Sequence, residues 1–194
     1  MAVPMDDSEL MQRVQDDQLE FFDELVQRYR IPLTRVAISK LRDASQAEDI
    51  VQETFLAVYA ARHTYKPEFA FRTWVWTILL NLCRKNWRKQ NRKPQEFSQS
   101  LFETTSLGSF PEPVSLETGL SRVLQLERDE LLFELLYELP EVQADAIRLR
   151  FFGELKYSEI ARTMQSSLIG AKVRVKKGLL TLAKWLQKKS GETP

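Results

Sequence analysis

Residues 69–93 read FAFRTWVWTILLNLCRKNWRKQNRK, and this stretch decides how the rest of the chain can fold. From Trp74 to Cys83, apolar side chains occupy nearly every face of a helix, which is typical of a helix buried among other helices. After Cys83 the pattern reverses, and the last turns carry Trp87 among six cations: Arg84, Lys85, Arg88, Lys89, Arg92 and Lys93. The stretch predicts a single helix that runs from a hydrophobic core to a strongly basic surface.

Two interpretations of the basic end are open. Cations in the last turn of a helix complement the negative end of its dipole, which would account for two or three of them. Six cations together with Trp87 and the amides between Asn81 and Asn91 fit a nucleic-acid surface better. Phosphates attract cations, and unstacked bases stack on aromatic faces. We therefore favour a nucleic-acid interface.

Composition predicts an all-α protein. The 194 residues can form one large domain or two small ones. The 6 glycines and 8 prolines are few, and the alternating apolar and polar pattern of β-strands is almost absent. A single cysteine, Cys83, and a single histidine, His63, exclude a disulfide framework and a zinc site, so we expect neither metal nor cofactor. A glycine-rich phosphate loop and a nucleophile with its base are also missing, which argues against an enzyme and a small-molecule substrate.

The formal net charge of +1 hides a segregation of charge along the chain. Residues 6–24 contain eight acids and one cation, whereas residues 145–189 contain eleven cations and three acids. Such asymmetry predicts different partners for different parts of the chain. Neither a signal peptide nor an apolar span of about 18 residues is found, so we expect a cytoplasmic protein that does not insert into a membrane.

The chain before the quoted stretch predicts further helices. Residues 7–30 fit one or two acidic helices, and Pro32 is expected to start or kink the next one. Another helix is expected to open at Ser45, because Ser45 and Glu48 have the spacing of a capping box. Its inward-facing residues are Ala47, Ile50, Val51, Thr54, Phe55 and Val58. Its outer face carries Glu48, Asp49, Gln52, Glu53 and Leu56. Such a face is often merely solvated, but an exposed Leu56 beside acids favours docking of a basic partner.

The segments AEDIVQETFLAVY (47–59) and FRTWVWTILLNLCRKNWRK (71–89) together resemble the second region of the extracytoplasmic-function (ECF) sigma factors of bacterial RNA polymerase. The resemblance implies that Glu48, Asp49, Gln52, Glu53 and Leu56 bind the clamp of the β′ subunit. It implies that the following loop and helix open promoter DNA and bind the melted strand of the minus-ten element through His63, Tyr65, Lys66, Arg72, Asn81, Lys85, Arg88 and Lys89. Lys85 departs from the family, where an acid is common nearby, so the base preference of relatives does not transfer.

Residues 94–121 differ in composition from their surroundings. They are rich in Pro, Gly, Ser and Thr, and their only charged residues are glutamates. This composition predicts a flexible acidic linker between a first domain, 1–93, and a second domain, 122–194. The linker could be a passive tether, but the resemblance implies that it threads toward the polymerase active cleft.

The second domain predicts helices over 122–137 and from Leu139-Pro140 to a C-cap at Gly153, then a helix–turn–helix over 155–177. LPEVQADAIRLRFFGELKYSEIA (139–161) resembles the fourth region of the same family, which contacts the polymerase β flap and reads the minus-thirty-five element. The implied DNA contacts are Arg150, Ser167, Lys172, Arg174, Lys176 and Lys177. Lys156 where a Ser or Thr cap is usual, Gln165 where a turn glycine is common, and Gly170 inside the recognition helix depart from the pattern.

These features favour a sigma factor that binds core RNA polymerase and directs promoter-specific initiation. The family further implies an anti-sigma partner that holds the two domains together. One alternative is an autonomous helix–turn–helix regulator that binds duplex DNA as a dimer without polymerase. Another is an adaptor whose basic faces bind acidic proteins.

Overall fold

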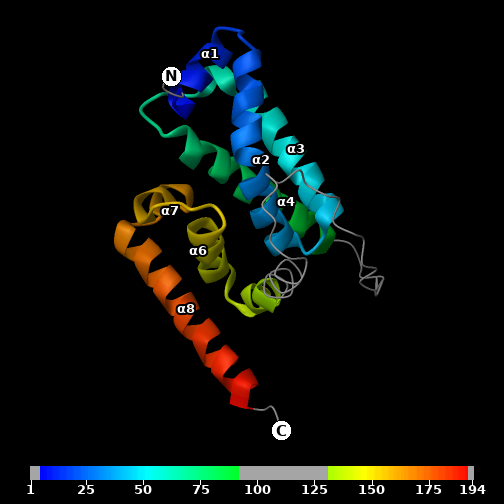
Figure 1. Cartoon of the computed structure of the whole chain (residues 1–194), viewed down its shortest axis with the longest axis vertical. Helices are drawn as coiled ribbons and strands as arrows, with labels where there is room; N and C mark the ends of the chain where they lie inside the picture. The colour runs from blue at the N-terminus through cyan, green and yellow to red at the C-terminus, as the bar shows by residue number, and fades with distance from the viewer. Residues whose placement is uncertain (1–4, 92–130, 192–194) are drawn as a thin grey trace, which may run out of the picture.

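The computed structural model describes residues 5–91, the first half, and residues 131–191, the second half. Every regular element in these ranges is helical, which confirms the all-α class with two helical units (Figure 1). The first half contains α1 (Asp7–Gln15), α2 (Glu20–Leu41), α3 (Ala44–Ala60), the 3₁₀ helix η1 (Arg62–Thr64) and α4 (Phe71–Asn91). The second half contains a helical segment at 131–138, then α6 (Glu141–Phe151), α7 (Tyr157–Thr163) and α8 (Leu168–Gly191). The expected linker, 94–121, lies outside the described residues.

The start of α3 corrects the expected capping box. Asp43, not Ser45, is the N-cap, and its carboxylate accepts a hydrogen bond from the Gln46 amide at 2.9 Å. The Gln46 side chain donates back to the same carboxylate at 2.6 Å. Asp43 and Gln46 have the same spacing as Ser45 and Glu48, and Asp43 has the extended backbone that an N-cap requires. Ser45 lies inside the helix.

Pro32 does not start a helix, because α2 continues through it over 22 residues. A proline inside a helix removes one backbone hydrogen bond and costs roughly 3 kcal/mol. The packing of one face of α2 offsets this cost, since Leu25, Leu33 and Val36 are completely buried.

The inward stripe predicted for α3 is confirmed, because all six of its residues are buried. α4 passes through the same core, where Val75, Trp76 and Leu79 are completely buried. Trp76 is therefore a core residue, as the all-round apolar pattern predicted, while Trp74 packs partly exposed at the edge of the core.

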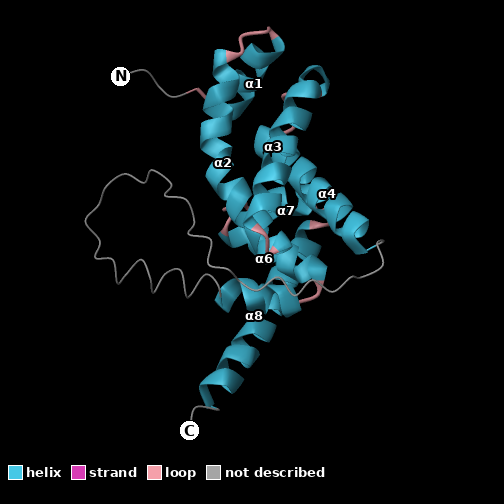
Figure 2. Ribbon diagram, turned by 90° about the vertical axis from the view of Figure 1, so that its right-hand side faces the viewer, coloured by secondary structure: helices cyan, strands magenta, loops and turns pink. Residues whose placement is uncertain are grey.

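The two halves are packed directly against each other, which the sequence did not predict. Leu149 of α6, Ile160 of α7 and Val175 of α8 belong to the same buried cluster as the core of the first half. Figure 1 shows α6 and α7 beneath the helices of the first half, and Figure 2 shows α8 extending away from the other helices. The contacts are made between α4 and α7 and between α2 and α6.

Gly153 lies at this contact, and it corrects the expected C-cap. α6 ends at a C-cap on Phe152, and Glu154, with φ 54°, takes the left-handed conformation. An added Cβ at Gly153 would lie 2.9 Å from the Leu149 carbonyl oxygen and 3.0 Å from Cζ2 of Trp76. Glycine is therefore needed here for close approach of the indole rather than for its backbone freedom.

The helix–turn–helix is present in the second half. Gln165 in the turn is left-handed, with φ 49°, at a cost of about 1 kcal/mol for a residue with a side chain. Lys156 is the N-cap of α7 and its backbone amide donates to the Glu159 carboxylate at 2.6 Å. Ser167 caps α8, because its hydroxyl accepts from the Gly170 amide at 3.0 Å.

Candidate nucleic-acid interface

The outer face of α3 is exposed to solvent in the described part of the chain. Leu56 is 69% exposed, and the charged and polar residues on the same face are exposed as well: Glu48, Asp49, Gln52 and Glu53. No ion pair within the described residues neutralises Asp49 or Glu53. A shallow hollow beside this face is lined by Val26, Arg30 and Thr34 of α2. One apolar side chain ringed by free acids suits a basic partner surface.

The loop after α3 and the basic end of α4 present most of the predicted minus-ten residues to solvent. The exposed ones are His63, Lys66, Asn81, Lys85, Arg88 and Lys89. Two further aromatic side chains are exposed, Phe69 by 60% in the loop before α4 and Trp87 by 56% near the end of α4. Sequence reasoning did not assign Phe69, although an aromatic residue in a polar loop was a visible signal. Exposed rings among cations can stack with unpaired bases.

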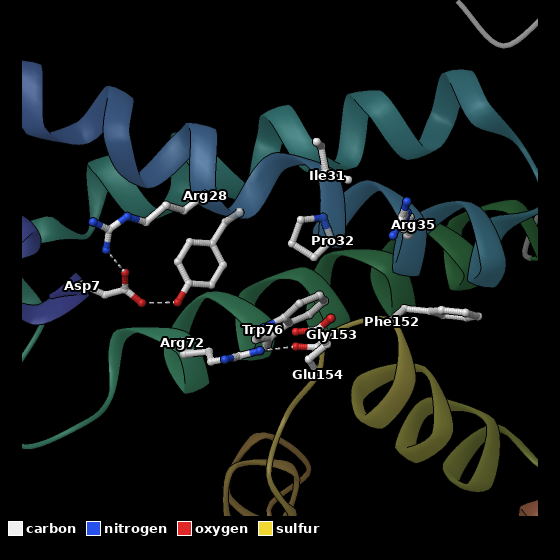
Figure 3. A pocket seen from close by; sticks show the side chains of 11 residues that line it. Asp7, Arg28, Ile31, Pro32, Arg35, Arg72, Trp76, Phe152, Gly153 and Glu154 are labelled. Carbon is white, nitrogen blue, oxygen red and sulfur yellow. Dashed lines mark hydrogen bonds and ion pairs between the residues drawn. The ribbon is translucent and has the colours of Figure 1, made fainter. Parts of the chain in front are cut away.

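Tyr65 and Arg72 are not exposed on this surface, and their contact with the minus-ten strand stays a prediction. The Tyr65 ring is buried against Trp74, with 5.3 Å between centroids, and its hydroxyl lies 3.1 Å from Oγ of Ser8. Burial raises the pKa of the Tyr65 hydroxyl. Arg72 is turned toward the second half, where its guanidinium donates to the Gly153 carbonyl oxygen at 2.5 Å (Figure 3).

A cleft of about 310 Å³ lies beside Arg72 between α2, α4 and the α6–α7 loop (Figure 3). Its polar groups are largely paired with one another. Arg28 donates to Asp7 at 2.9 Å, and the Tyr29 hydroxyl donates to the same carboxylate. The Nε1 atom of Trp76 is buried without a hydrogen-bond partner in the described chain. Because residues of both halves line the cleft, it lies at the contact between the halves.

Asp145 of α6 is the electrostatic centre of that contact. Its carboxylate is completely buried and accepts hydrogen bonds from Lys40 at 2.8 and 3.0 Å and from Arg148 at 3.2 Å. Arg84 lies 3.5 Å away, so one of the six cations of the quoted stretch binds the second half.

The groups around Asp145 are held away from water. Arg148 also donates to the Ser39 hydroxyl at 3.0 Å and to the Ser39 carbonyl oxygen at 2.9 Å. Burial lowers the pKa of the Arg148 guanidinium. Burial likewise raises the pKa of the neighbouring Cys83 thiol to about 12, so the thiol stays protonated and unreactive near neutral pH.

The predicted minus-thirty-five residues differ in their exposure to solvent. Lys172, Lys176 and Lys177 are exposed on α8. Arg150 is half-buried, donating to the Leu155 carbonyl oxygen at 3.1 Å with its guanidinium 5.4 Å from the Tyr157 ring. Arg174 is half-buried and Ser167 is exposed, but the Ser167 hydroxyl is used as a cap.

Apolar residues lie among these lysines on α8. Ile169 is 74% exposed and Val173 is 42% exposed, one turn apart on the face that carries Lys172 and Lys176. Sequence reasoning missed both, because apolar residues in an amphipathic helix are assigned to its buried face by default. Among the described residues there is no metal-binding cluster of His, Cys, Asp or Glu, and no helix there could cross a membrane.

Comparison with known proteins identifies both halves. The profile of Sigma-70 region 2 matches residues 25–93, and the profile of Sigma-70 region 4 matches residues 129–182. The RNA polymerase sigma-H factor of Pseudomonas aeruginosa is 26% identical over 187 residues, covering 96% of this chain and 97% of the relative. The ECF RNA polymerase sigma-E factor of Escherichia coli is 28% identical over 164 residues, covering 84% and 85%.

Solved structures share the fold. CnrH in complex with the cytosolic domain of CnrY matches with a TM-score of 0.69 at 21% identity, covering 94% of this chain and 97% of CnrH. The sigma factor RpoE in complex with the anti-sigma factor NepR from Bartonella quintana matches with a TM-score of 0.62 at 25% identity, covering 84% and 97%. With a region 2 and a region 4 in the order and at the positions given, this chain belongs to the ECF group of the sigma-70 family of RNA polymerase sigma factors.

Proposed function

We propose that this sigma factor binds core RNA polymerase through the outer face of α3 and opens promoter DNA with the loop after α3 and the basic end of α4. Its second half contacts the upstream element through α8. The observation that carries the proposal is the arrangement of α3 and α4, which pack in one buried core. α3 presents exposed acids and Leu56 to solvent, and α4 presents its basic end. The polymerase acts in the cytoplasm, so the proposal locates the protein there.

The polymerase contact is tested by reversing charge on α3. Replacing Asp49 and Glu53 by arginine is expected to weaken binding to core polymerase by more than roughly 100-fold, since like charges brought together across an interface cost several kcal/mol. Co-elution with purified core polymerase and run-off transcription measure the effect. Replacing the exposed Glu20 and Asp23 of α2 by arginine makes the same change in net charge and should leave assembly intact. Normal assembly of the α3 variant would refute the proposed docking face.

The DNA contact is tested by removing charge from the end of α4. We expect that replacing Arg88 and Lys89 by alanine weakens the salt dependence of open-complex formation. The slope of log K against log salt concentration should fall in magnitude by about 2, because each phosphate contact releases about one counterion. Permanganate reactivity of unpaired thymines in the holoenzyme complex measures opening. A variant with Arg13 and Arg35 replaced by alanine is the control, because both cations are exposed on other helices. An unchanged salt slope and full opening would remove the end of α4 from the interface.

The same reconstituted system separates the alternative functions. A sigma factor confers promoter-specific transcription on core polymerase alone, whereas an autonomous regulator requires an existing holoenzyme and an adaptor yields no transcript. We also propose that an anti-sigma protein binds this chain, by analogy with RpoE and NepR. Such a partner is expected to cover the outer face of α3, and it should therefore compete with core polymerase in the co-elution assay.

A further inference from the structure

Two exposed apolar side chains at the start of α8, Ile169 and Val173, belong to neither buried cluster of the described chain. Ile169 is 74% exposed and Val173 is 42% exposed, while the opposite face of α8 buries Ala171 and Val175 in the core. Apolar residues exposed together at the surface mark a binding site more often than chance. Their partner must therefore offer apolar groups at this face of the helix.

The residues around them indicate that this partner is DNA. Ile169, Lys172, Val173 and Lys176 are spaced i, i+3, i+4 and i+7, so they lie on one face, and both lysines are exposed. α8 is the second helix of the helix–turn–helix, and in this motif the N-terminal part of that helix contacts base edges in the major groove. Cations between the apolar residues disfavour an apolar protein groove and favour a polyanion.

Only one group in the major groove suits an aliphatic side chain. The 5-methyl group of thymine is apolar, whereas the other groove edges are hydrogen-bond donors and acceptors. One helical turn separates Ile169 from Val173, which is about 6 Å along the axis and spans one to two base-pair steps. Two neighbouring thymines therefore match the spacing of the two side chains.

We propose that Ile169 and Val173 read the methyl groups of two thymines within two base-pair steps of each other in the upstream promoter element. The inference rests on the proposed function and adds a base preference to it. Arg174 and Arg150, which the sequence suggested for this element, are half-buried and do not share the face. Lys172, between the two apolar residues, and Lys176, one turn beyond them, then contact guanine or phosphate.

The test uses holoenzyme assembled from the full chain and core polymerase. Templates with a randomised upstream element are transcribed, the most active ones are sequenced, and each selected thymine is then replaced by deoxyuridine. Deoxyuridine keeps the base-pairing groups and lacks only the methyl, so holoenzyme affinity should fall about 4-fold at each of two positions. Ile169→Ala should abolish the loss at one position and Val173→Ala at the other.

Leu180→Ala is the matched control, because Leu180 is exposed farther along α8 and its loss should leave both deoxyuridine effects in place. If transcription depends on the upstream element but deoxyuridine has no effect, the methyl readout is wrong and the sigma function stands. If no template is transcribed, the proposed function itself fails. If Ile169→Ala weakens binding to core polymerase without DNA, the face docks a protein and the inference is overturned.

Discussion

Replacing Asp145 by alanine is expected to lower the free energy of unfolding by about 3–5 kcal/mol, because it leaves buried cations without their counter-ion. Asp145 is completely buried, Lys40 lies 2.8 Å from its carboxylate, and Arg148 lies 3.2 Å from it. In the variant, the partners that Arg148 keeps among the described residues are the Ser39 oxygens. Urea unfolding at neutral pH, followed by circular dichroism, measures the loss.

Glu141→Ala is the matched control for this prediction. Glu141 also binds Lys40, at 2.9 Å, but its side chain is largely exposed. Ion pairs exposed to water contribute roughly 0–1 kcal/mol, so this variant should unfold almost like the parent chain. Equal stability of the two variants would mean that the buried carboxylate does not hold the halves together.

Replacing Trp76 by alanine is expected to lower the free energy of unfolding by about 3–5 kcal/mol, since the substitution leaves a cavity where a completely buried indole packs. The indole is completely buried and approaches Gly153 of the second half, so its loss affects both halves at once. We expect a lower midpoint and a single, less cooperative urea transition. Calorimetry and the near-ultraviolet signal of the remaining tryptophans measure the change.

Trp87→Ala, in the same helix, is the control, because Trp87 is 56% exposed. A surface substitution of this kind changes stability by less than about 0.5 kcal/mol. It should nevertheless weaken open-complex formation if Trp87 stacks on an unpaired base. A large loss of stability in Trp87→Ala would contradict the exposure of this side chain.

Local patterns made much of this fold predictable. The six buried residues of α3 follow a helical period, and the all-round apolar run in α4 could only be buried. The start of α3 was misplaced because two overlapping cap patterns, at Asp43 and at Ser45, have the same spacing. The sequence alone does not decide which of the two residues is the N-cap, because the choice depends on the residue at which α2 ends.

The placements that the sequence did not predict all concern contacts between segments distant in sequence. Tyr65 looked like a polar loop residue, but the loop folds back so that its hydroxyl meets Ser8. Arg72, which is predicted to contact DNA, donates in this structure to the carbonyl of Gly153. Asp145 received no role from the sequence, and its main cation is Lys40, which is 105 residues away in the chain. Periodicity carries no information about such pairings.

The ionic centre of the contact between the halves lowers the cost of separating them. For the proposed function, one chain must reach promoter positions about 25 base pairs apart, which is roughly 85 Å of duplex. When the halves part, Lys40, Asp145 and Arg148 each regain a hydration shell, which partly repays the broken pairing. A purely apolar contact would gain no favourable hydration free energy when it separated. The ion pairs that stabilise the contact in the unbound chain are therefore groups whose hydration favours separation of the halves.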